Sequence, residues 1–434
     1  MTDSNHPDFV QTKSAQARPA RAADLRRHNL ALLTRLVSGH ESLTRAELSR
    51  MTRLTKGTVS SLVEELIDRE FLVEHAVDTQ GRLGRPPSGV LALNGNSHCG
   101  IGVEINIDYI AVSVADLLRR VRFHSVEARD NRKVRRSTVL GRAARLVEMA
   151  AAAAADAGLR PVGVALAVPG PVDVERGILM RAPGLAWSDV AVVAELRRRL
   201  TRLDLPVLAE NQANLAALGE LWLGLGADAG DYVHVSGESG VGGGIIVDGA
   251  LFRGARGFAG EIGHIVVDPQ GPVCTCGGRG CLGRVAGKET LFELAGLRPD
   301  TPTRLGGSDP VLQEFLAMLE RRDPRATGAL DQVAQALGLA LADIVNLLDP
   351  DTIVLGGIYA ALSPWLIEPL SATLSRQSIL GAKTPVSVRA SLLGPDAAVR
   401  GAATWVVQRL LAGELPSPGP LQPVSSPKRK KVAA

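Results

Sequence analysis

Residues 261–283 read EIGHIVVDPQGPVCTCGGRGCLG and hold three of the chain's four cysteines within eight positions. Cys274 and Cys276 are one residue apart, Cys281 follows after GGRG, and His264 precedes all three. Glycine permits the tight turns that would let these thiolates converge on one ion. One histidine and three cysteines form a recognised tetrahedral zinc set, which leaves no open position for a catalytic water. The stretch therefore predicts one structural zinc per chain, held by His264, Cys274, Cys276 and Cys281. Three reduced thiols without metal are the alternative.

The composition of the whole chain favours a metal site over a disulfide. Four cysteines in 434 residues, without an apolar leader or an apolar run of membrane-spanning length, predict a reducing cytoplasm and no membrane contact. Clustered cysteines in that compartment hold metal more often than they form disulfides. Hydrophobic residues at 45% and charged residues at 22% are typical of a soluble globular protein. The length predicts two or three domains. The net charge of +4 does not by itself indicate a partner, because its distribution over the chain is not yet known.

Residues 21–95 carry the pattern of a winged helix-turn-helix. Leucines recur at helical spacing from Leu30 to Leu36. Thr44 followed by Glu47 has the form of a capping box, so a short helix should begin there. Thr55 can cap a second helix, and two short helices joined by a tight turn are the helix-turn-helix pattern. Residues 71–94, FLVEHAVDTQGRLGRPPSGVLALN, then predict a strand, a turn and a second strand, which would form the wing.

Polar and basic side chains lie where such a domain contacts DNA. A recognition helix needs small or polar residues near its N-terminus. Lys56 suits a phosphate contact, Thr58 and Ser61 suit base edges, and Arg85, before a proline pair, suits a narrow minor groove. The expected DNA contacts are Arg26, Arg27, Thr55, Lys56, Thr58, Ser60, Ser61, Arg82 and Arg85. The alternative is a helical hairpin with solvated charges and no DNA contact.

Residues 96–413 alternate strands and helices, which indicates a mixed α/β region long enough for two lobes around a cleft. The expected strands include GIGVEINI, IAVSVADL, VGVALAVPG, PVLAEN, YVHVSG, GGGIIVDG and TIVLGG. Residues 1–20 and the Pro- and Ser-rich residues 414–434 are predicted to be disordered. The basic cluster Lys428–Lys431 resembles a nuclear-localisation signal, but we prefer a solvated tail that contacts DNA phosphates.

Several motifs resemble those of the ROK family (repressors, open reading frames and sugar kinases), in its xylose-repressor-like and N-acetylglucosamine-repressor-like branch. The resemblance covers Leu25 to Leu411 and rests on SRMTRLTKGTVSSLVEELIDREFLVE with GRLGRPP, and on VPGPVD, APGL, ENQANLAALGE, GFAGEIGH and CTCGGRGCL. It implies an α/β fold in which an N-terminal winged helix-turn-helix domain precedes a two-lobed actin/hexokinase-like domain. It also maps the family's zinc motif onto the four residues named above. Because two-fold proteins bind two-fold DNA sites, we expect a homodimer or homotetramer.

The same resemblance identifies two departures from the family's kinases. The Asp that acts as base in their E-N-D-x-N motif corresponds to Gln212, which cannot accept a proton at neutral pH. Their phosphate-binding D-x-G-G-T turn corresponds to residues 104–108, which lack the glycines and carry acidic side chains. The second glycine-rich loop, Ser239–Gly244, is retained. These two losses predict that the chain does not transfer phosphate.

The sugar-binding positions implied by the resemblance are altered in part. An Asn that contacts sugar hydroxyls corresponds to Gly184, and a Glu after the last zinc cysteine corresponds to Gly283. Each missing hydrogen bond removes about 1–3 kcal/mol, so ordinary hexoses should bind weakly, or the ligand should differ. The effector contacts that remain are Asn211, Gln212, Glu261 and His264.

The leading hypothesis is a sequence-specific DNA-binding regulator, a repressor of carbohydrate-related genes. Its partners would be double-stranded operator DNA and a sugar or phosphosugar effector. An active sugar kinase with a DNA-binding appendage is the enzymatic alternative, and Gln212 with the turn at residues 104–108 argues against it. A third hypothesis is an effector-independent module that recruits another regulator.

Overall fold

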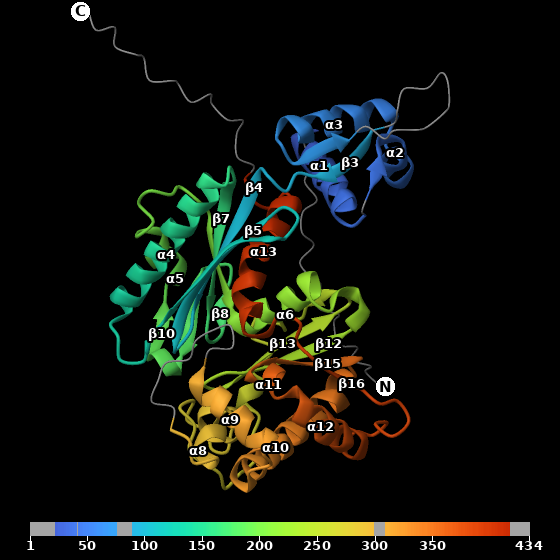
Figure 1. The fold of residues 1–434 in the computed structure, drawn as a ribbon. Helices are drawn as coiled ribbons and strands as arrows, with labels where there is room; N and C mark the ends of the chain where they lie inside the picture. The colour runs from blue at the N-terminus through green and yellow to red at the C-terminus, as the bar shows by residue number, and fades with distance from the viewer. Residues whose placement is uncertain (1–21, 41, 76–88, 299–308, 417–434) are drawn as a thin grey trace, which may run out of the picture.

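The computed structural model describes residues 22–40, 42–75, 89–298 and 309–416. A small N-terminal unit lies above a body of two lobes (Figure 1). Residues 1–20, the wing tip with Arg82 and Arg85, and residues 417–434 lie outside the described residues. The predictions made for them therefore stay predictions.

The N-terminal unit has the predicted order of two short helices and a hairpin. Thr44 and Glu47 form the full capping box at the start of the first helix. Arg53 ends that helix in the left-handed conformation, with φ 58°. Thr55 caps the next helix by accepting a bond from the Thr58 amide at 3.2 Å. The elements are α1 (Ala22–Ser38), β1 (Leu43–Thr44), α2 (Arg45–Thr52), α3 (Lys56–Asp68), β2 (Leu72–His75) and β3 (Val90–Leu93), with the strands in the order β1-β3-β2.

Lobe one is a five-stranded sheet in the order β11-β7-β4-β5-β6. The first three strands in chain order are antiparallel, whereas β7 and β11 run parallel to β4. A small antiparallel sheet, β10-β9-β8, is inserted after β7. The elements are β4 (His98–Ile105), β5 (Tyr109–Asp116), β6 (Val121–Ala128), α4 (Arg136–Asp156), β7 (Arg160–Val168), β8 (Val172–Asp173), β9 (Ile178–Ala182), β10 (Trp187–Val190), α5 (Val192–Arg197) and β11 (Val207–Asn211).

Lobe two repeats this order in β14-β13-β12-β15-β16, again with two antiparallel neighbours and two parallel ones. Each lobe thus places one hairpin turn at the edge of the cleft, between β4 and β5 or between β12 and β13. The elements are α6 (Gln212–Leu223), β12 (Tyr232–Gly237), β13 (Val241–Val247), β14 (Ala250–Leu251), α7 (Leu282–Val285), α8 (Lys288–Leu294), α9 (Pro310–Glu320), α10 (Pro324–Leu348), β15 (Thr352–Gly357), α11 (Ile358–Ala361), α12 (Ser363–Gln377) and β16 (Ser387–Ala390).

Two helices, α6 and α13 (Ala397–Leu411), pack against each other between the lobes (Figure 1). Glycines allow each to approach its sheet closely. A Cβ at Gly102 on β4 would lie 2.3 Å from the Val399 carbonyl oxygen of α13, and one at Gly244 on β13 would lie 2.6 Å from the Ala213 carbonyl oxygen of α6. The backbone of each helix is therefore in direct contact with the backbone of a strand.

One sequence prediction needs correction, and the sequence did not indicate every strand. Strand β6 was not among those expected; it lies at the sheet edge, and its side chains are exposed or half-buried. Leu415, assigned to the tail, is 8% exposed and packs on the body. One helix, α10, is long and apolar enough to cross a membrane by length and composition alone, but 67% of its most apolar window is buried inside the fold, as in a core helix.

Candidate metal centre, interlobe cleft and nucleic-acid interface

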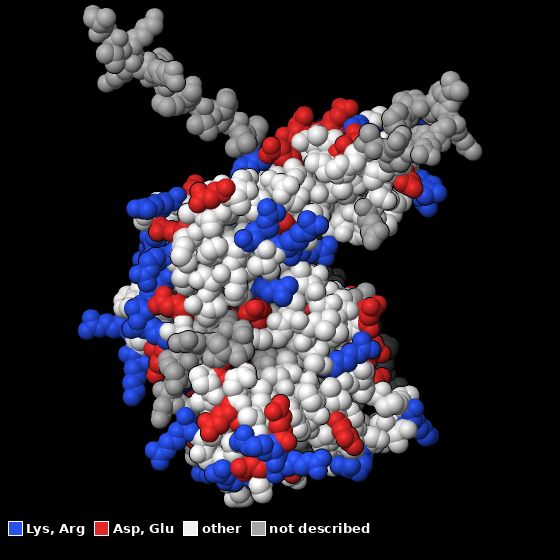
Figure 2. All heavy atoms as spheres, viewed as in Figure 1, with Lys and Arg blue, Asp and Glu red and all other residues white. Residues whose placement is uncertain are grey.

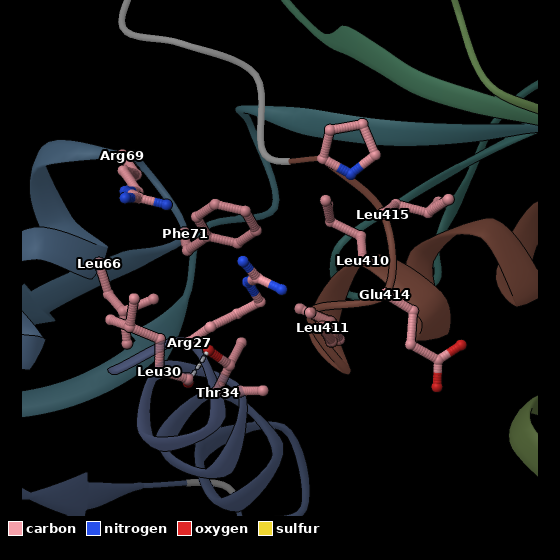
Figure 3. A pocket seen from close by; sticks show the side chains of 13 residues that line it. Arg27, Leu30, Thr34, Leu66, Arg69, Phe71, Leu410, Leu411, Glu414 and Leu415 are labelled. Carbon is pink, nitrogen blue, oxygen red and sulfur yellow. Dashed lines mark hydrogen bonds between the residues drawn. The ribbon is translucent and has the colours of Figure 1, made fainter. Parts of the chain in front are cut away.

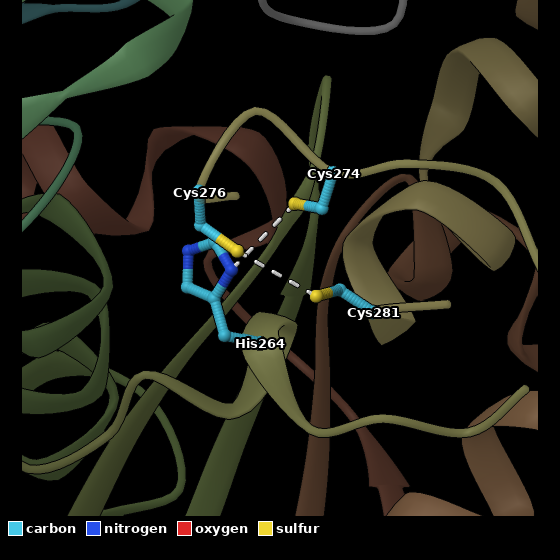
Figure 4. A group of neighbouring side chains, drawn as sticks. All are labelled: His264, Cys274, Cys276 and Cys281. Atoms are coloured by element: carbon cyan, nitrogen blue, oxygen red, sulfur yellow. Dashed lines mark hydrogen bonds between the residues drawn. The ribbon is translucent and has the colours of Figure 1, made fainter. Parts of the chain in front are cut away.

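The four predicted metal ligands meet at one point of lobe two (Figure 4). Their ligand atoms all lie within 4.8 Å of one another. The Sγ atoms of Cys276 and Cys281 are 3.7 Å apart, and Cys274 Sγ is 3.8 Å from His264 Nδ1. A zinc–sulfur bond of about 2.3 Å makes the edge of a tetrahedron about 3.8 Å. The cluster therefore has the spacing that a tetrahedral metal site requires, with Nδ1 as the histidine ligand atom.

Glycines shape the metal loop as the sequence indicated. Gly277 and Gly280 have φ angles of +99° and +67°, a region that other residues rarely adopt. A Cβ at Gly280 would also lie 1.5 Å from the Asp268 carbonyl oxygen. The Gly278 amide donates to Cys276 Sγ at 3.3 Å and so lowers the pKa of that thiol. The backbone thus favours the thiolate that a metal ligand needs.

A side chain of lobe one reaches this loop. Arg181, at the end of β9, donates to the carbonyl oxygens of Thr275 at 3.0 Å and Cys276 at 3.4 Å. Arg181 lies three residues before Gly184, which the sequence analysis expects at an altered sugar position. The metal loop therefore connects lobe two to the segment of lobe one that leads into the cleft. No sequence pattern indicated this contact, because the partners are more than 90 positions apart.

The four predicted effector residues come from two neighbouring segments. Asn211 and Gln212 lie at the start of α6, where the Asn211 Oδ1 accepts from the Ala213 amide at 2.7 Å. Glu261 Oε2 lies 4.0 Å from His264 Nε2, on the side of the ring opposite Nδ1. Burial raises the pKa of the Glu261 carboxyl. The two segments adjoin, since a Cβ at Gly260 would lie 3.7 Å from Asn214 Oδ1.

Of these four, Gln212 lines a small cavity between the lobes that Glu104, Ser236 and Glu238 also line. The cavity measures about 20 Å³, which is room for about one water. Glu104 accepts from the Tyr109 hydroxyl at 2.8 Å through Oε1, while its Oε2 has no hydrogen-bond partner among the described residues. Burial raises the pKa of Glu104 to about 8 and that of Glu238 to about 7. A phosphate here would meet two carboxyl groups beside the glycines Gly242 and Gly394.

Some of the predicted DNA contacts are exposed, whereas others already contact side chains of the N-terminal unit. Thr55, Lys56 and Thr58 are exposed at the N-terminus of α3. Arg26 instead pairs with Glu65 of α3, with 2.7 Å between Nε and Oε2, and it lies 3.5 Å from the Ser61 hydroxyl. Ser60 is half-buried.

The helix-turn-helix offers two further basic side chains that the sequence reasoning missed. Arg50 and Arg53 are exposed and flank the turn before α3, and neither is among the arginines that form ion pairs within the described chain. Their position in SRMTRLT, just before the capping Thr55, was the available signal.

The basic excess of the chain lies mainly outside the N-terminal unit. Residues 119–202 hold 17 Lys and Arg against 8 Asp and Glu, and Figure 2 shows basic side chains along the outer edge of lobe one. The described part of the N-terminal unit holds eight basic and seven acidic residues. The described part of the N-terminal unit thus has an excess of only one positive charge.

The N-terminal unit is attached to lobe one by specific contacts. Phe71 stacks on His98, with ring centroids 4.9 Å apart, and Glu70 pairs with Arg160. Burial lowers the pKa of His98 to about 4, so the ring is neutral in this contact. Beside the junction, α1 and α13 line a cavity of about 380 Å³. Arg27 points into it (Figure 3), toward the body of the protein and away from α3.

Comparisons with known proteins cover both parts of the chain. The ROK family model matches residues 100–409. A putative xylose repressor of Caldicellulosiruptor sp. (strain Rt8B.4) is 29% identical over 395 residues, which are 88% of this chain and 96% of that protein. The crystal structure of a ROK family transcriptional regulator, a homolog of the E. coli MLC protein, has a TM-score of 0.74 at 25% identity and covers 90% of this chain and 98% of its own.

A kinase relative matches a smaller share of the chain. The structure of a ROK family glucokinase from Streptomyces griseus, in complex with glucose and AMPPNP, has a TM-score of 0.60 at 28% identity. It covers 71% of this chain and 98% of its own. The regulators thus match the N-terminal unit as well as the two lobes.

Proposed function

The chain belongs to the ROK family, and from this premise we propose that it is a DNA-binding transcriptional repressor of carbohydrate-related genes. One observation carries the proposal. An N-terminal unit whose helix α3 has an exposed N-terminus precedes the ROK domain, and by the resemblance to the family's kinases Gln212 replaces their base. The relatives that match nearly the whole chain are named as a xylose repressor and a transcriptional regulator, which supports the same function. The protein would act in the cytoplasm, on the nucleoid when bound to DNA.

The proposed DNA contact centres on the N-terminus of α3. Lys56, Arg50 and Arg53 would neutralise phosphates, while Thr58 and Ser61 would reach base edges. Thr58 Oγ1 is 2.9 Å from Thr55 Oγ1, so the cap holds it in place without using its full bonding capacity. A homodimer or homotetramer would present two such helices to an inverted repeat.

Selection of bound fragments from genomic DNA, followed by titration at several salt concentrations, tests this proposal. Lys56→Ala and Arg53→Ala should each weaken binding to all sequences and lower the salt slope by about 0.9 for each phosphate that is no longer neutralised. Lys383→Ala, an exposed lysine of lobe two, is the matched control. Slopes equal to that of the wild type in both variants would remove α3 from the DNA interface.

We propose further that the ROK domain senses a sugar or phosphosugar without phosphorylating it. Asn211, Gln212, Glu261 and His264 would contact the ligand. Purified protein should consume no Mg-ATP above background with glucose, mannose, xylose or their N-acetyl amines. Turnover that disappears in Gln212→Ala would instead support the kinase alternative.

The metal cluster is proposed to hold one structural zinc. Zinc bound by His264 Nδ1 and three thiolates would fix the loop that contacts Arg181 and orient the His264 ring toward Glu261. Elemental analysis should find one zinc per chain in the wild type and none in Cys276→Ser. If the effector response of operator binding also disappears in the variant, zinc supports sensing. A normal response without zinc would leave the site with no role in sensing.

A further inference from the structure

Four charged side chains connect the lobes across the cleft. Asp108 of lobe one accepts from Lys288 Nζ of lobe two at 2.8 Å. Asp108 also accepts from Arg132 Nη1 at 2.7 Å, and Arg132 pairs in turn with Glu289 of lobe two. The Asp108 and Lys288 side chains are 7% and 4% exposed, whereas Arg132 and Glu289 are about one-third exposed. A buried pair and a half-exposed pair therefore lie side by side between the lobes.

The lobe-one side of this network is held rigidly. Asp108 lies in the β4–β5 turn, at the position that the kinases use for phosphate. Asn131, fully buried, donates its side-chain amide to the Asn106 carbonyl oxygen at 2.8 Å. The backbone amides of Arg129 and Asn131 donate to the carbonyl oxygens of Asp108 and Ile107, each at 2.7 Å. The turn is thus bracketed by the segment after β6.

On the lobe-two side, Lys288 connects both hairpin turns. It is the first residue of α8, and its backbone amide donates to the Glu238 carbonyl oxygen at 3.0 Å, in the β12–β13 turn. Its side chain reaches Asp108 in the β4–β5 turn. One residue thus joins the two equivalent turns.

The same turn fills the altered sugar position. A Cβ at Gly184 would lie 2.2 Å from Ile107 Cδ1 and 3.1 Å from Ile107 Cγ1. A side chain such as Asn at this position would require the end of the Ile107 side chain to move. Glycine at 184 and isoleucine at 107 therefore fit each other, and both lie beside the ion network.

We propose that the β4–β5 turn is an internal occupant of the cleft, and that Asp108, Arg132, Lys288 and Glu289 form a latch holding the lobes together without a nucleotide. The Asp108 carboxylate supplies the buried Lys288 ammonium with an anionic partner from within the chain. Ile107 fills the neighbouring space. The latch follows from the contacts alone. Only its consequence for operator binding would rest on the proposed function.

Hydrogen exchange of the full-length protein without DNA tests the latch. Lys288→Met removes one of the two cations that pair with the buried Asp108 carboxylate and leaves Arg132, and losing a partner of a buried charge is destabilising. Lys288→Met should therefore raise amide exchange of residues 106–109 and of α8 at least about tenfold. Asp108→Leu combined with Lys288→Met replaces both charges with apolar groups, and it should return exchange toward the wild-type rate. Lys383→Met, an exposed lysine, is the matched control and should change nothing in the cleft.

Two further sets of exchange measurements test the latch, one with variants of the half-exposed pair and one with Mg-ATP. If Lys288→Met does not fold, Arg132→Gln and Glu289→Gln affect the half-exposed pair and should raise exchange of the same segments by a smaller factor. Wild-type exchange in every folded variant would overturn the latch. Millimolar Mg-ATP should leave the wild-type exchange unchanged. Protection of residues 106–109 by Mg-ATP would show that nucleotide enters this space, and would also overturn the proposal.

Discussion

The two lobes share one strand order, yet their hairpin turns face the cleft in different ways. In lobe one the β4–β5 turn presents Ile107 and Asp108, which are packed against Gly184 and Lys288. In lobe two the β12–β13 turn is rich in glycine, and a Cβ at Gly240 would meet nothing within 4 Å. The lobe-one turn thus has its side chains packed against the other lobe, whereas the lobe-two turn leaves free space beside Gly240. A repeated fold can keep its packing while a single turn determines whether ligand enters.

The largest expected effect tests the part that the lobes have in common. Gly102→Ala and Gly244→Ala would each bring a Cβ within 2.6 Å of helix backbone, which cannot rotate away. Each should lower the free energy of unfolding by about 1–3 kcal/mol, measured by denaturant titration. Gly141→Ala on α4, where a Cβ meets nothing within 4 Å, is the control and should stabilise by about 0.5–1 kcal/mol. If only one of the two variants lost stability, the packing of α6 on lobe two and of α13 on lobe one would not be equivalent.

Local features of the fold and the site were predictable from the sequence, whereas contacts between distant segments were not. The capping box at Thr44 and the metal ligands depend on residues close in the chain, so their spacing alone indicated the structure. Asp108 and Lys288 are 180 positions apart, and only the closure of two lobes brings them together. Leu415 was misassigned for a similar reason, because its burial depends on a surface that the tail composition does not reveal.

A second, smaller effect concerns the carboxyl group beside the filled turn. Burial raises the pKa of Glu104 to about 8 from the ordinary 4.5. The folded chain therefore holds a proton that the unfolded chain releases, and stability falls as pH rises from about 4.5 to about 8. Glu104→Gln should match the wild type near pH 5 and exceed its Tm by about 2–4 °C at pH 9. Scanning calorimetry across pH measures this difference.

The control for the pH prediction is Glu320→Gln, an exposed carboxyl on α9. It should leave the pH profile unchanged. Parallel profiles for Glu104→Gln and the wild type would mean that the Glu104 side chain is solvated and ionised in solution. The filled turn of lobe one would then be more open than the contacts indicate.

The smallest expected effect tests the open turn of lobe two. Gly240→Ala adds a methyl group where no atom lies within 4 Å, so the free energy of unfolding should change by less than about 0.5 kcal/mol. If a ligand's anionic group approaches this backbone, the same methyl group should weaken ligand binding while stability stays constant. Denaturant titration and calorimetric titration of phosphosugars separate the two readouts. A stability loss above about 1 kcal/mol would show that this turn is packed in solution. The two turns would then differ in their side chains and not in their packing. The contrast drawn between the lobes would fail.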